Sequence, residues 1–512
     1  MSVLALDNAF QLSLVMLGRL LWVYLGQVLA QYSAKPFFAS REYALTYEGS
    51  FQPTVCVVDA GEALVISDEG SDCLAEGTFK EEIESTGWNR LHIRHQAGVL
   101  GYYAAGLAEG VLTGPLILSH LHNMFEVYAG DFESLYEYYS QRDSALLTLI
   151  TSSPDPVLAG LRAQLEGVLD GANLMQAGLT LQDLYFINTD GSISDLFTVA
   201  QNSRSFLGAS RLYPRCSALI KTVGAEIYFG HATMEDYREM NRVIKSYEWP
   251  EGAEIMSSYP GAISSTDDFV LTSKGIAVME TSLETDMSMA NNYENAGLFA
   301  FYRLQKAART SATALQFIDT FLQNNDDTYS SSWMILDFEQ YEEDPMREAF
   351  FVLETAPGYT RYEDKSAYLQ GTGYWASYNN PALSTTPAFS SNTLRRDQFA
   401  LLQGNITSLA DFQRVLRFNG FNPQHCAPAD PLQPCSPDRS ISSRQDLAMY
   451  GSTDAKVTSK ELMERVGFWG ISGPTTEGLP PFAFSPMTTR EYIPTEWDFD
   501  WVLADVWTNA RD

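Results

Sequence analysis

The sequence changes character at Cys216, and this change constrains the fold more than any other feature. Before it, residues 92–123 and 155–185 are apolar, and the first of them carries small residues spaced for close helix packing. Both segments therefore predict helices. After it, Ser217–Val223 and Glu226–Phe229 are short β-prone runs around a Val-Gly-Ala turn, which predicts a hairpin. Helices before and after several antiparallel strands favour an α+β fold with helices layered on sheets.

More strands are expected in the second half of the chain. A second hairpin is predicted at Phe269–Thr272 and Ile276–Ser282, with further strands at Trp333–Phe338 and Phe350–Glu354. Thr233 is expected to cap a helix that carries an apolar stripe. The stripe consists of Met234, Tyr237, Met240, Val243, Ile244 and Tyr247.

The segment that leads to Cys216 is predicted to be an exposed loop. Asp190–Ser210 is polar, rich in Ser, Asp and Gly, and lacks periodicity. Exposed loops of this kind are where a chain is most easily cut.

Composition bounds the class of protein. The 512 residues are 45% hydrophobic, enough for a sizeable core in two to four domains or in one large α/β unit. The 33 basic and 64 acidic side chains give a net charge of −31. This charge argues against nucleic acid as a partner, because phosphate binding needs a basic surface. It also repels anionic membranes at neutral pH, although transient contact becomes easier as carboxylates protonate.

The N-terminus predicts export. Leu20–Ala30 has the length of the apolar region of a signal peptide and ends in a small-residue cleavage site, so residues 1–30 are assigned to a signal peptide. An uncleaved anchor or a buried helix is the alternative, and Arg19 argues against a clean membrane span. The sequon Asn405–Thr407 is compatible with glycosylation at Asn405 on the secretory route. A secreted or lysosome-like location is expected.

Four of the five cysteines form two local pairs. Cys56 with Cys73 and Cys426 with Cys435 are predicted disulfides of an oxidising compartment. Cys216 is left over, and an odd cysteine in an exported protein is either an intermolecular partner or a reactive thiol. A buried structural cysteine is the third interpretation.

A thiol needs a base to act as a nucleophile near neutral pH. His231, at the far end of the predicted hairpin, is one candidate. The other appears if the bond between Arg215 and Cys216 breaks, because the freed α-amino group has a reference pKa of roughly 7.7–8.0. The Cys216 thiol could make this cut itself by attacking the carbonyl of Arg215.

A series of ordered motifs resembles one protein family. Cys216–Lys221 is similar to the start of the catalytic chain of the phospholipase B-like (lamina ancestor-like) proteins, and Gly106–Gly114 resembles their N-terminal helix. The likeness runs from about residue 40 to the C-terminus. The other matching motifs are Ser257–Gly261, Asp267–Phe269, Glu280–Ser282, Trp333–Asp337, Trp375–Asn379, Arg396–Gln398, Arg417–Asn419, Ile441–Arg444 and Asp454–Ser459.

The resemblance implies an N-terminal-nucleophile hydrolase with an αββα four-layer sandwich. Residues 31–215 and 216–512 would form one intertwined domain after cleavage before Cys216. Cys216 would be the nucleophile and its freed amine the base, while His231 would steady the amine or the substrate. Asn379 falls at the position of an oxyanion-hole amide, and Thr281 at a polar position at the end of the second hairpin.

The implied reaction is deacylation of glycerophospholipids through a thioester, without a cofactor or metal. An N-acyl amide hydrolase of the same fold is the nearest alternative, and a non-catalytic lipid-binding relative is another. Two departures from the family pattern keep the last one open: Met234 replaces an aromatic residue, and Ser390 stands where an arginine is expected. Arg395 or Arg396 is a candidate substitute for that arginine.

Other polar motifs have simpler interpretations. His120 and His122 have a metal-like spacing, but without acidic or cysteine neighbours in register they are expected to be packing residues of a helix. Asp267 and Asp268 are expected to cap or hydrogen bond within a turn rather than act as an acid–base pair. Asp337, at the end of an apolar strand, is open to either interpretation.

Overall fold

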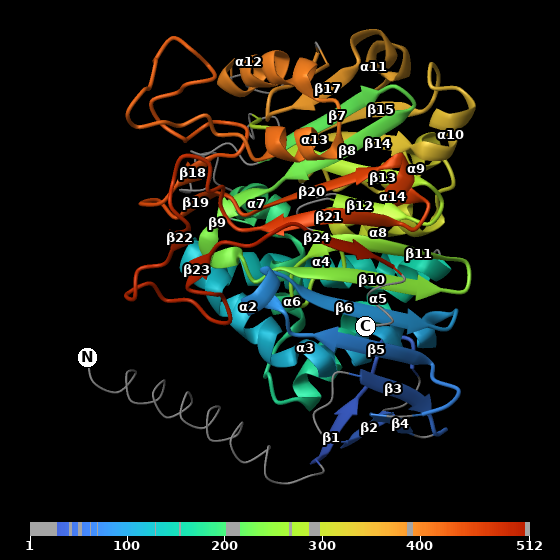
Figure 1. Cartoon of the computed structure of the whole chain (residues 1–512). Helices are drawn as coiled ribbons and strands as arrows, with labels where there is room; N and C mark the ends of the chain where they lie inside the picture. Colours follow the sequence, from blue (N-terminus) through green and yellow to red (C-terminus); the bar gives the residue numbers. More distant parts are fainter. Residues whose placement is uncertain are drawn as a thin grey trace.

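The computed structural model describes residues 28–39, 43–49, 54–61, 63–68, 70–128, 130–152, 155–200, 216–265, 269–285, 297–383, 385–386 and 393–506. Within them, two large β-sheets organise a mixed arrangement of helices and strands (Figure 1). The predicted α+β class is confirmed in this sense. Most of the predicted signal peptide, residues 1–27, lies outside the described residues.

Sheet A, the larger sheet, has thirteen strands drawn from both sides of Cys216. Strand β6 pairs in parallel with β10, so residues from before and after position 216 share one ladder. In spatial order the strands are β1 (Val28–Ala34), β2 (Tyr43–Gly49), β4 (Ala63–Ser67), β3 (Thr54–Asp59), β5 (Ala75–Lys80), β6 (Asn89–His95), β10 (Val243–Trp249), β11 (Gly252–Ser258), β12 (Phe269–Thr272), β13 (Ile276–Ser282), β14 (Ser331–Asp337), β15 (Phe350–Ala356) and β16 (Tyr359–Asp364).

Sheet B has six strands, all from the part of the chain after Cys216. Their order is β17 (Tyr374–Ser377), β7 (Ser217–Val223), β8 (Glu226–Ala232), β20 (Asp454–Ser459), β21 (Gly467–Ser472) and β24 (Val502–Asp505). Two small sheets are formed by β18 (Arg444–Gln445), β19 (Tyr450–Ser452) and β9 (Met234–Asp236), and by β22 (Phe482–Ala483) and β23 (Glu496–Trp497).

The described helices come from both sides of Cys216 in the sequence. They are α2 (Ile83–Thr86), α3 (Val99–Val127), α4 (Phe132–Ser152), α5 (Pro156–Leu174), α6 (Leu181–Asn188), α7 (Ile193–Ala200), α8 (Ala300–Thr310), α9 (Ala314–Phe321), α10 (Phe338–Glu343), α11 (Ser366–Thr372), α12 (Thr393–Leu402), α13 (Leu409–Leu416) and α14 (Lys460–Met463).

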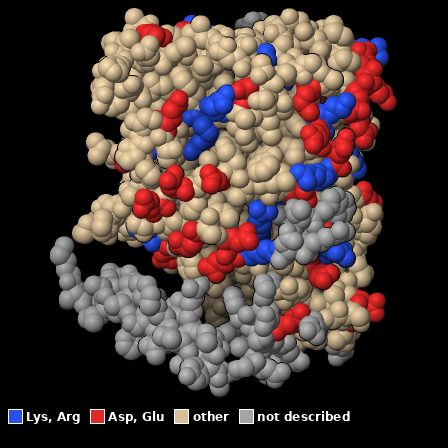
Figure 2. All heavy atoms as spheres, in the orientation of Figure 1, with Lys and Arg blue, Asp and Glu red and all other residues tan. Residues whose placement is uncertain are grey.

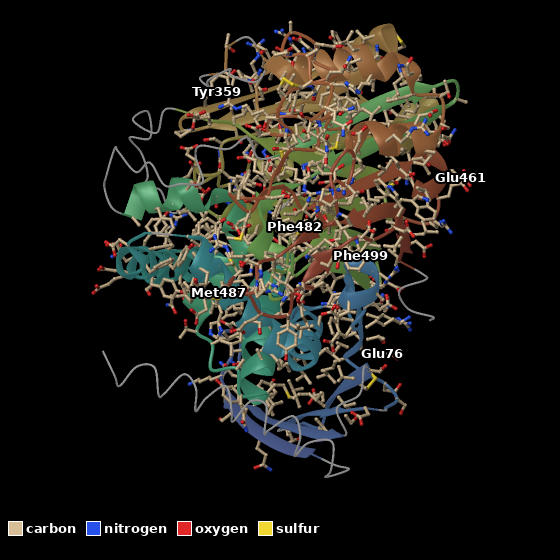
Figure 3. All side chains as sticks on the ribbon, turned by 60° about the vertical axis from the view of Figure 1, so that its left-hand side comes forward. Glu76, Tyr359, Glu461, Phe482, Met487 and Phe499 are labelled. Carbon is tan, nitrogen blue, oxygen red and sulfur yellow. A yellow bond between two sulfur atoms is a disulfide. The ribbon has the colours of Figure 1, made fainter. Side chains whose placement is uncertain are left out.

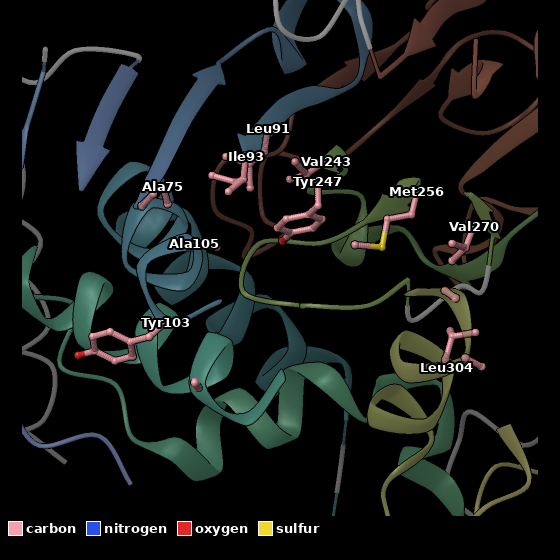
Figure 4. Packing of buried hydrophobic residues seen from close by; sticks show 14 of the residues in the cluster. Ala75, Leu91, Ile93, Tyr103, Ala105, Val243, Tyr247, Met256, Val270 and Leu304 are labelled. Atoms are coloured by element: carbon pink, nitrogen blue, oxygen red, sulfur yellow. The ribbon is translucent and has the colours of Figure 1, made fainter. Parts of the chain in front are cut away.

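Three apolar cores define the order of the layers. One joins α3, α5, α8 and α9 to sheet A, with Ile93 and Tyr247 on the strands and Tyr103 and Leu304 on the helices (Figure 4). A second lies between the sheets, and a third joins sheet B to α12 and α13. Strand side chains alternate between faces, so both sheets are apolar on two sides.

Helices α3 and α5 approach each other closely because small residues line their contact. A Cβ on Gly106 would lie 2.0 Å from the carbonyl oxygen of Gln164, and one on Gly171 would lie 2.5 Å from that of Leu107. Only glycine permits these backbone contacts. Helix α3 is long and apolar enough to cross a membrane, but 89% of its most apolar window is buried inside the protein, as in a core helix.

Both predicted hairpins are confirmed. β7 and β8 form the first, with β8 extending beyond the predicted end to Ala232, and β12 and β13 match the second at every boundary. The strands expected near Trp333 and Phe350 are also present as β14 and β15. The Cys56–Cys73 and Cys426–Cys435 disulfides are present as predicted.

The helix predicted after Thr233 is wrong. This segment forms β9, a short 3-10 turn at Tyr237–Glu239, and β10. In β10, Val243 and Tyr247 face the helices while Ile244 faces sheet B, so the strand is apolar on both sides. A strand buried on both faces imitates a helical apolar stripe.

Two further boundaries differ from the expectation. Residues 92–95 belong to β6 rather than to the following helix, because their backbone pairs with β5 and β10. Asp190–Ser192 forms a 3-10 turn and α7 follows it, so the first half of the predicted loop is helical. The sequence there supplies Leu196 and Phe197 to a buried core, which stabilises the helix. Residues 201–215 lie outside the described residues.

Candidate active site

Cys216 stands at the head of β7, at one end of sheet B. It is 3% exposed and is the free cysteine of the described chain. Ala218 and Ile220, two and four residues along, belong to the core between the sheets, so the Cys216 side chain lies on that side. The first pair of the hairpin joins Ser217 to Ala232, which places Cys216 across from Thr233.

Arg395 holds the backbone at Cys216. This fully buried side chain of α12 donates from Nη1 to the carbonyl oxygen of Cys216 and, at 3.1 Å, to Oγ of Ser217. Its Nη2 donates to the carbonyl oxygen of Tyr378 at 2.8 Å and to Oδ1 of Asn379 at 2.5 Å. Burial lowers the pKa of Arg395 to about 9, partly offset by the neighbouring thiol.

The structure therefore distinguishes between the two arginines that the sequence left open. The Arg396 side chain is 55% exposed and pairs with Asp397 at 2.8 Å. Ser390 lies outside the described residues. Of the two, Arg395 is the one that reaches the site.

Asn379 is fixed at both ends of its amide. Oδ1 accepts from Arg395, and Nδ2 donates to the carbonyl oxygen of Ser282 at 2.8 Å. The residue has φ 64°, a left-handed conformation in which asparagine is among the best tolerated residues. Asn379 lies two residues after the end of β17, and Arg395 links its amide to the carbonyl oxygen of Cys216. One of the two Nδ2 hydrogens has no part in the bond to Ser282.

Thr281 meets sheet B through a hydroxyl contact. Its Oγ1 lies 2.6 Å from Oγ of Ser377, and both side chains are buried. Ser377 pairs with Ala218 in the ladder between β17 and β7, two residues from Cys216. Thr281 is thus brought to the same end of the two sheets as the cysteine.

His231 also points between the sheets and is fully buried. Its Nε2 lies 2.8 Å from the carbonyl oxygen of Glu280, so Nε2 carries the hydrogen. Its Nδ1 lies 3.4 Å from Oγ1 of Thr233. Each ring nitrogen has a partner, and through its contact with Glu280 His231 connects β8 to β13.

A buried charge network that the sequence motifs did not predict lies next to His231. Lys456 donates to Oγ1 of Thr233 at 2.5 Å and to Oδ1 of Asp454 at 2.6 Å. Arg242 pairs with the other oxygen of Asp454 at 2.7 Å. The signal was present in the sequence: Asp454 and Lys456 are two residues apart in a β-prone run, where period-two alternation puts both on one face.

The surroundings of the Cys216 thiol favour its protonated form. Burial raises the pKa of Cys216 well above its ordinary value, and the carboxylates of Glu280 and Glu235 raise it further. The backbone N–H of Met234 and the charge of Lys456 act in the opposite direction. Met234, which departs from the family pattern, therefore contacts the thiol through its backbone N–H.

The other sequence candidates lie elsewhere. Asp337 caps α10, accepting from the backbone N–H of Gln340 at 2.9 Å, which is a structural role. His120 is buried and stacks on Tyr259, whereas His122 bonds Glu491 at the surface. Within the described residues, no three His, Cys, Asp or Glu side chains gather as metal ligands would.

Three more predictions have a partial outcome. Asn405 is exposed, as a glycosylated residue has to be, and its modification stays a prediction. Arg215, Asp267 and Asp268 lie outside the described residues.

On the face in Figure 2, the described acidic side chains are spread over the surface and the basic ones stand in small separate groups.

Comparison with known proteins identifies the family. A sequence profile described as Phospholipase B matches residues 75–504 of this chain. The chain belongs to the phospholipase B family. The family resemblance inferred from the sequence motifs is therefore confirmed. Membership of this family supports a hydrolase function on lipid esters.

Curated relatives match along almost their whole length. Phospholipase B-like protein C of Dictyostelium discoideum is 28% identical over 509 residues, which cover 86% of this chain and 89% of that protein. Putative phospholipase B-like 2 of Caenorhabditis elegans is 26% identical, covering 95% and 93%. Phospholipase B of Crotalus adamanteus is 26% identical, covering 94% and 95%.

Proposed function

We propose that this protein is a self-processing N-terminal-nucleophile hydrolase that deacylates glycerophospholipids through Cys216. The observation that carries the proposal is the position of Cys216: it directly precedes β7, an inner strand of sheet B, with its backbone held by Arg395 and its thiol between the sheets. Helices on the outer faces of two stacked sheets agree with the αββα sandwich of such enzymes.

The first step is cleavage of the chain before Cys216. Sγ attacks the carbonyl carbon of Arg215, the peptide nitrogen takes up a proton as its bond to that carbon breaks, and a thioester joins the two residues. The α-amino group of Cys216 is free from this point, and water then hydrolyses the thioester to give the carboxylate of Arg215 and the thiol of Cys216. This amine becomes the base that the buried thiol lacks in the uncut chain.

The second step transfers an acyl group from the lipid. The α-amine takes the thiol proton as Sγ attacks the ester carbonyl, and returns it to the departing glycerol oxygen. Water then hydrolyses the acyl thioester to a fatty acid and restores the thiol. Asn379, oriented by Arg395 and Ser282, would offer its Nδ2 hydrogen to the oxyanion. Thr281 and His231 would keep the two sheets in register around the reacting sulfur.

The location proposed from the sequence agrees with the disulfides. Cys56–Cys73 and Cys426–Cys435 belong to an oxidising compartment. We therefore retain a signal peptide over residues 1–30, glycosylation at Asn405, and a secreted or lysosome-like destination. N-terminal sequencing of the exported protein tests the first, and removal of an N-glycan by an endoglycosidase tests the second.

The alternative function, hydrolysis of N-acyl amides, would use the same residues of this site. Processed protein incubated with a diacyl phosphatidylcholine is expected to release fatty acid faster than from an N-acyl amide of the same chain length, and a Cys216→Ala variant should release neither. Release from the amide alone would replace the esterase by an amidase. Lipid binding without release from either substrate would favour the non-catalytic relative.

A further inference from the structure

Sheet A ends in β16, a strand whose outer edge no described strand covers. β16 is the last strand in the spatial order and pairs with β15 on its inner side. Tyr359, the first residue of β16, lies near the top of the view in Figure 3, and Glu76, on β5, lies near the bottom. The outer edge of such a strand presents backbone N–H and C=O groups to any strand that can align with them.

The ladder between β15 and β16 determines which residues offer these groups. The N–H of Lys365 donates to the carbonyl oxygen of Phe350 at 2.8 Å, so these two residues extend the ladder as a hydrogen-bonded pair. Hydrogen-bonded and non-hydrogen-bonded pairs alternate along an antiparallel ladder. The odd-numbered residues of β16 therefore point their backbone groups at β15. The backbone groups of Thr360, Tyr362 and Asp364 point outward.

A second copy of β16 is complementary to this edge when the two strands run antiparallel about Tyr362. The two Tyr362 residues then exchange both backbone hydrogen bonds, and Thr360 of each copy pairs with Asp364 of the other. Arg361 lies opposite Glu363 of the second copy in a non-hydrogen-bonded pair, the type that brings facing side chains closest. The two-fold axis repeats this contact, so the register contains two pairs of opposite charges.

Charge favours this register over its neighbours. Moving the two-fold axis to Arg361 or to Glu363 keeps the outward backbone groups paired, but it sets two arginines or two glutamates directly opposite each other. Like charges in such a pair are destabilising. With the axis at Tyr362, each Arg361 instead lies between two carboxylates: that of Glu363 in its own strand, with which it forms an ion pair, and that of Glu363 in the second copy. Charged residues usually protect an edge strand from pairing, whereas these two alternate in sign and complement themselves.

Exposed apolar side chains accompany the charges. Among the described residues, the large exposed hydrophobic side chains include Met346, Tyr362 and Tyr368. Tyr362 is on β16 itself, and Tyr368 lies on α11, which follows it. Met346 is two residues before Glu348, whose N–H donates to Oδ2 of Asp364 at 2.8 Å. Tyrosine, methionine and arginine are enriched at protein interfaces.

We infer that the protein forms a two-fold symmetric dimer in which β16 pairs antiparallel with β16 of a second copy of this chain, about Tyr362. Sheet A of one subunit then continues into sheet A of the other. A second copy is the partner because Arg361 and Glu363 complement each other in the register that the outward backbone groups allow. The inference goes beyond the proposed function, and neither depends on the other.

Analytical ultracentrifugation of the full chain tests the dimer. Wild type is expected to be dimeric at about 50 μM and to dissociate on dilution, because a pair of six-residue strands makes a small interface. Arg361→Glu and Glu363→Arg each set like charges opposite each other twice, so each variant should self-associate at least about tenfold more weakly. A wild type that is monomeric at every concentration overturns the inference.

An equimolar mixture of the two variants tests the contact itself. In a mixed dimer, Arg361→Glu in one subunit and Glu363→Arg in the other again place opposite charges across both pairs. Association in the mixture is therefore expected to return to within about threefold of wild type. Arg361 also donates to Oγ1 of Thr385 in its own chain at 2.8 Å, but loss of that bond is not repaired by mixing. Failure of the mixture to associate contradicts the pairing.

A proline variant gives an independent result if a charge variant fails to fold. Tyr362→Pro removes an outward N–H, which an edge strand tolerates, and with it the hydrogen bonds at the two-fold axis. It should be monomeric at the concentration where wild type is dimeric, with a Tm close to wild type. Arg414→Glu, 75% exposed on α13, is the charge-matched control and should remain dimeric. A dimeric Tyr362→Pro, or a monomeric Arg414→Glu, overturns the inference.

Discussion

The guanidinium of Arg395 bonds both the carbonyl oxygen of Cys216 and Oδ1 of Asn379. One buried cation therefore fixes the backbone of the proposed nucleophile and the amide proposed to stabilise the oxyanion. Asn379 in turn bonds Ser282 on sheet A. The site is thus held by contacts between α12, sheet B and sheet A rather than by any one loop.

Replacing Arg395 tests this link. Arg395→Gln is expected to slow both chain cleavage and kcat/KM by at least about tenfold, because hydrogen bonds to a charged group contribute roughly 1.5–3 kcal/mol. Arg396→Gln is the matched control and should stay near wild type, since Arg396 is exposed. Gel analysis of processing and a fatty-acid release assay measure both. Equal losses in the two variants would contradict the assignment.

The reactivity of the Cys216 thiol should change when the chain is cut. In the intact chain, burial raises the thiol pKa, so alkylation by iodoacetamide at pH 8 is expected to be slow. In the 216–512 fragment the adjacent amine can take the proton, and alkylation should be at least about tenfold faster. Mass spectrometry of a partly processed sample compares both forms in one tube. Equal labelling rates would argue against an amine base.

Lys456 supports the negative charge that forms on sulfur, because its own charge lowers the Cys216 pKa. In Lys456→Met the acid limb of the pH–rate profile of the processed enzyme is expected to move to higher pH, with a lower kcat at pH 5. Lys460→Met, on the exposed side of α14, is the control. A loss of kcat that is the same at every pH would indicate a structural role only.

Asp170 should make stability depend on pH. Burial raises the pKa of Asp170 to about 7, against an ordinary value of 3.8, with Glu166 adding to the shift. A raised carboxyl pKa favours the folded state fully below pH 3.8, and that stability is lost as the pH rises to about 7. Asp170→Asn should therefore raise Tm over wild type more at pH 8 than at pH 4.

The expected size and control follow from the same contact. Raising the pKa of Asp170 from 3.8 to about 7 corresponds to up to about 4 kcal/mol. Tyr103 can donate to the asparagine oxygen as it does to the carboxylate at 2.6 Å. Asp319→Asn, at an exposed position of α9, is the control. A gain in Tm that is equal at both pH values would contradict the account.

Local patterns predicted the strands near the site better than the helices. The hairpin of β12 and β13 was predicted with its observed boundaries because Lys274-Gly275 marks the turn and an apolar run lies on each side of that turn. The segment after Thr233 failed because β10 is buried by helices on one face and by sheet B on the other. A single sequence does not reveal which faces of a strand are covered by other helices and sheets.

The site residues divide in the same way. Motif resemblance pointed to Cys216, His231, Thr281 and Asn379, and all four lie at one end of the two sheets. It could not distinguish Arg395 from Arg396, because neighbouring residues on a helix point about 100° apart and the helix phase depends on tertiary contacts. Lys456 was missed because its partner Thr233, which follows β8, reaches it only when β8 and β20 pair.

The most direct test of the central claim is intact-mass analysis with N-terminal sequencing of wild type and Cys216→Ala. Wild type is expected to yield a fragment that begins at Cys216 and ends at Asp512, while the variant remains uncut before residue 216. Cleavage of Cys216→Ala at the bond after Arg215 would contradict self-processing and assign the cut to another protease.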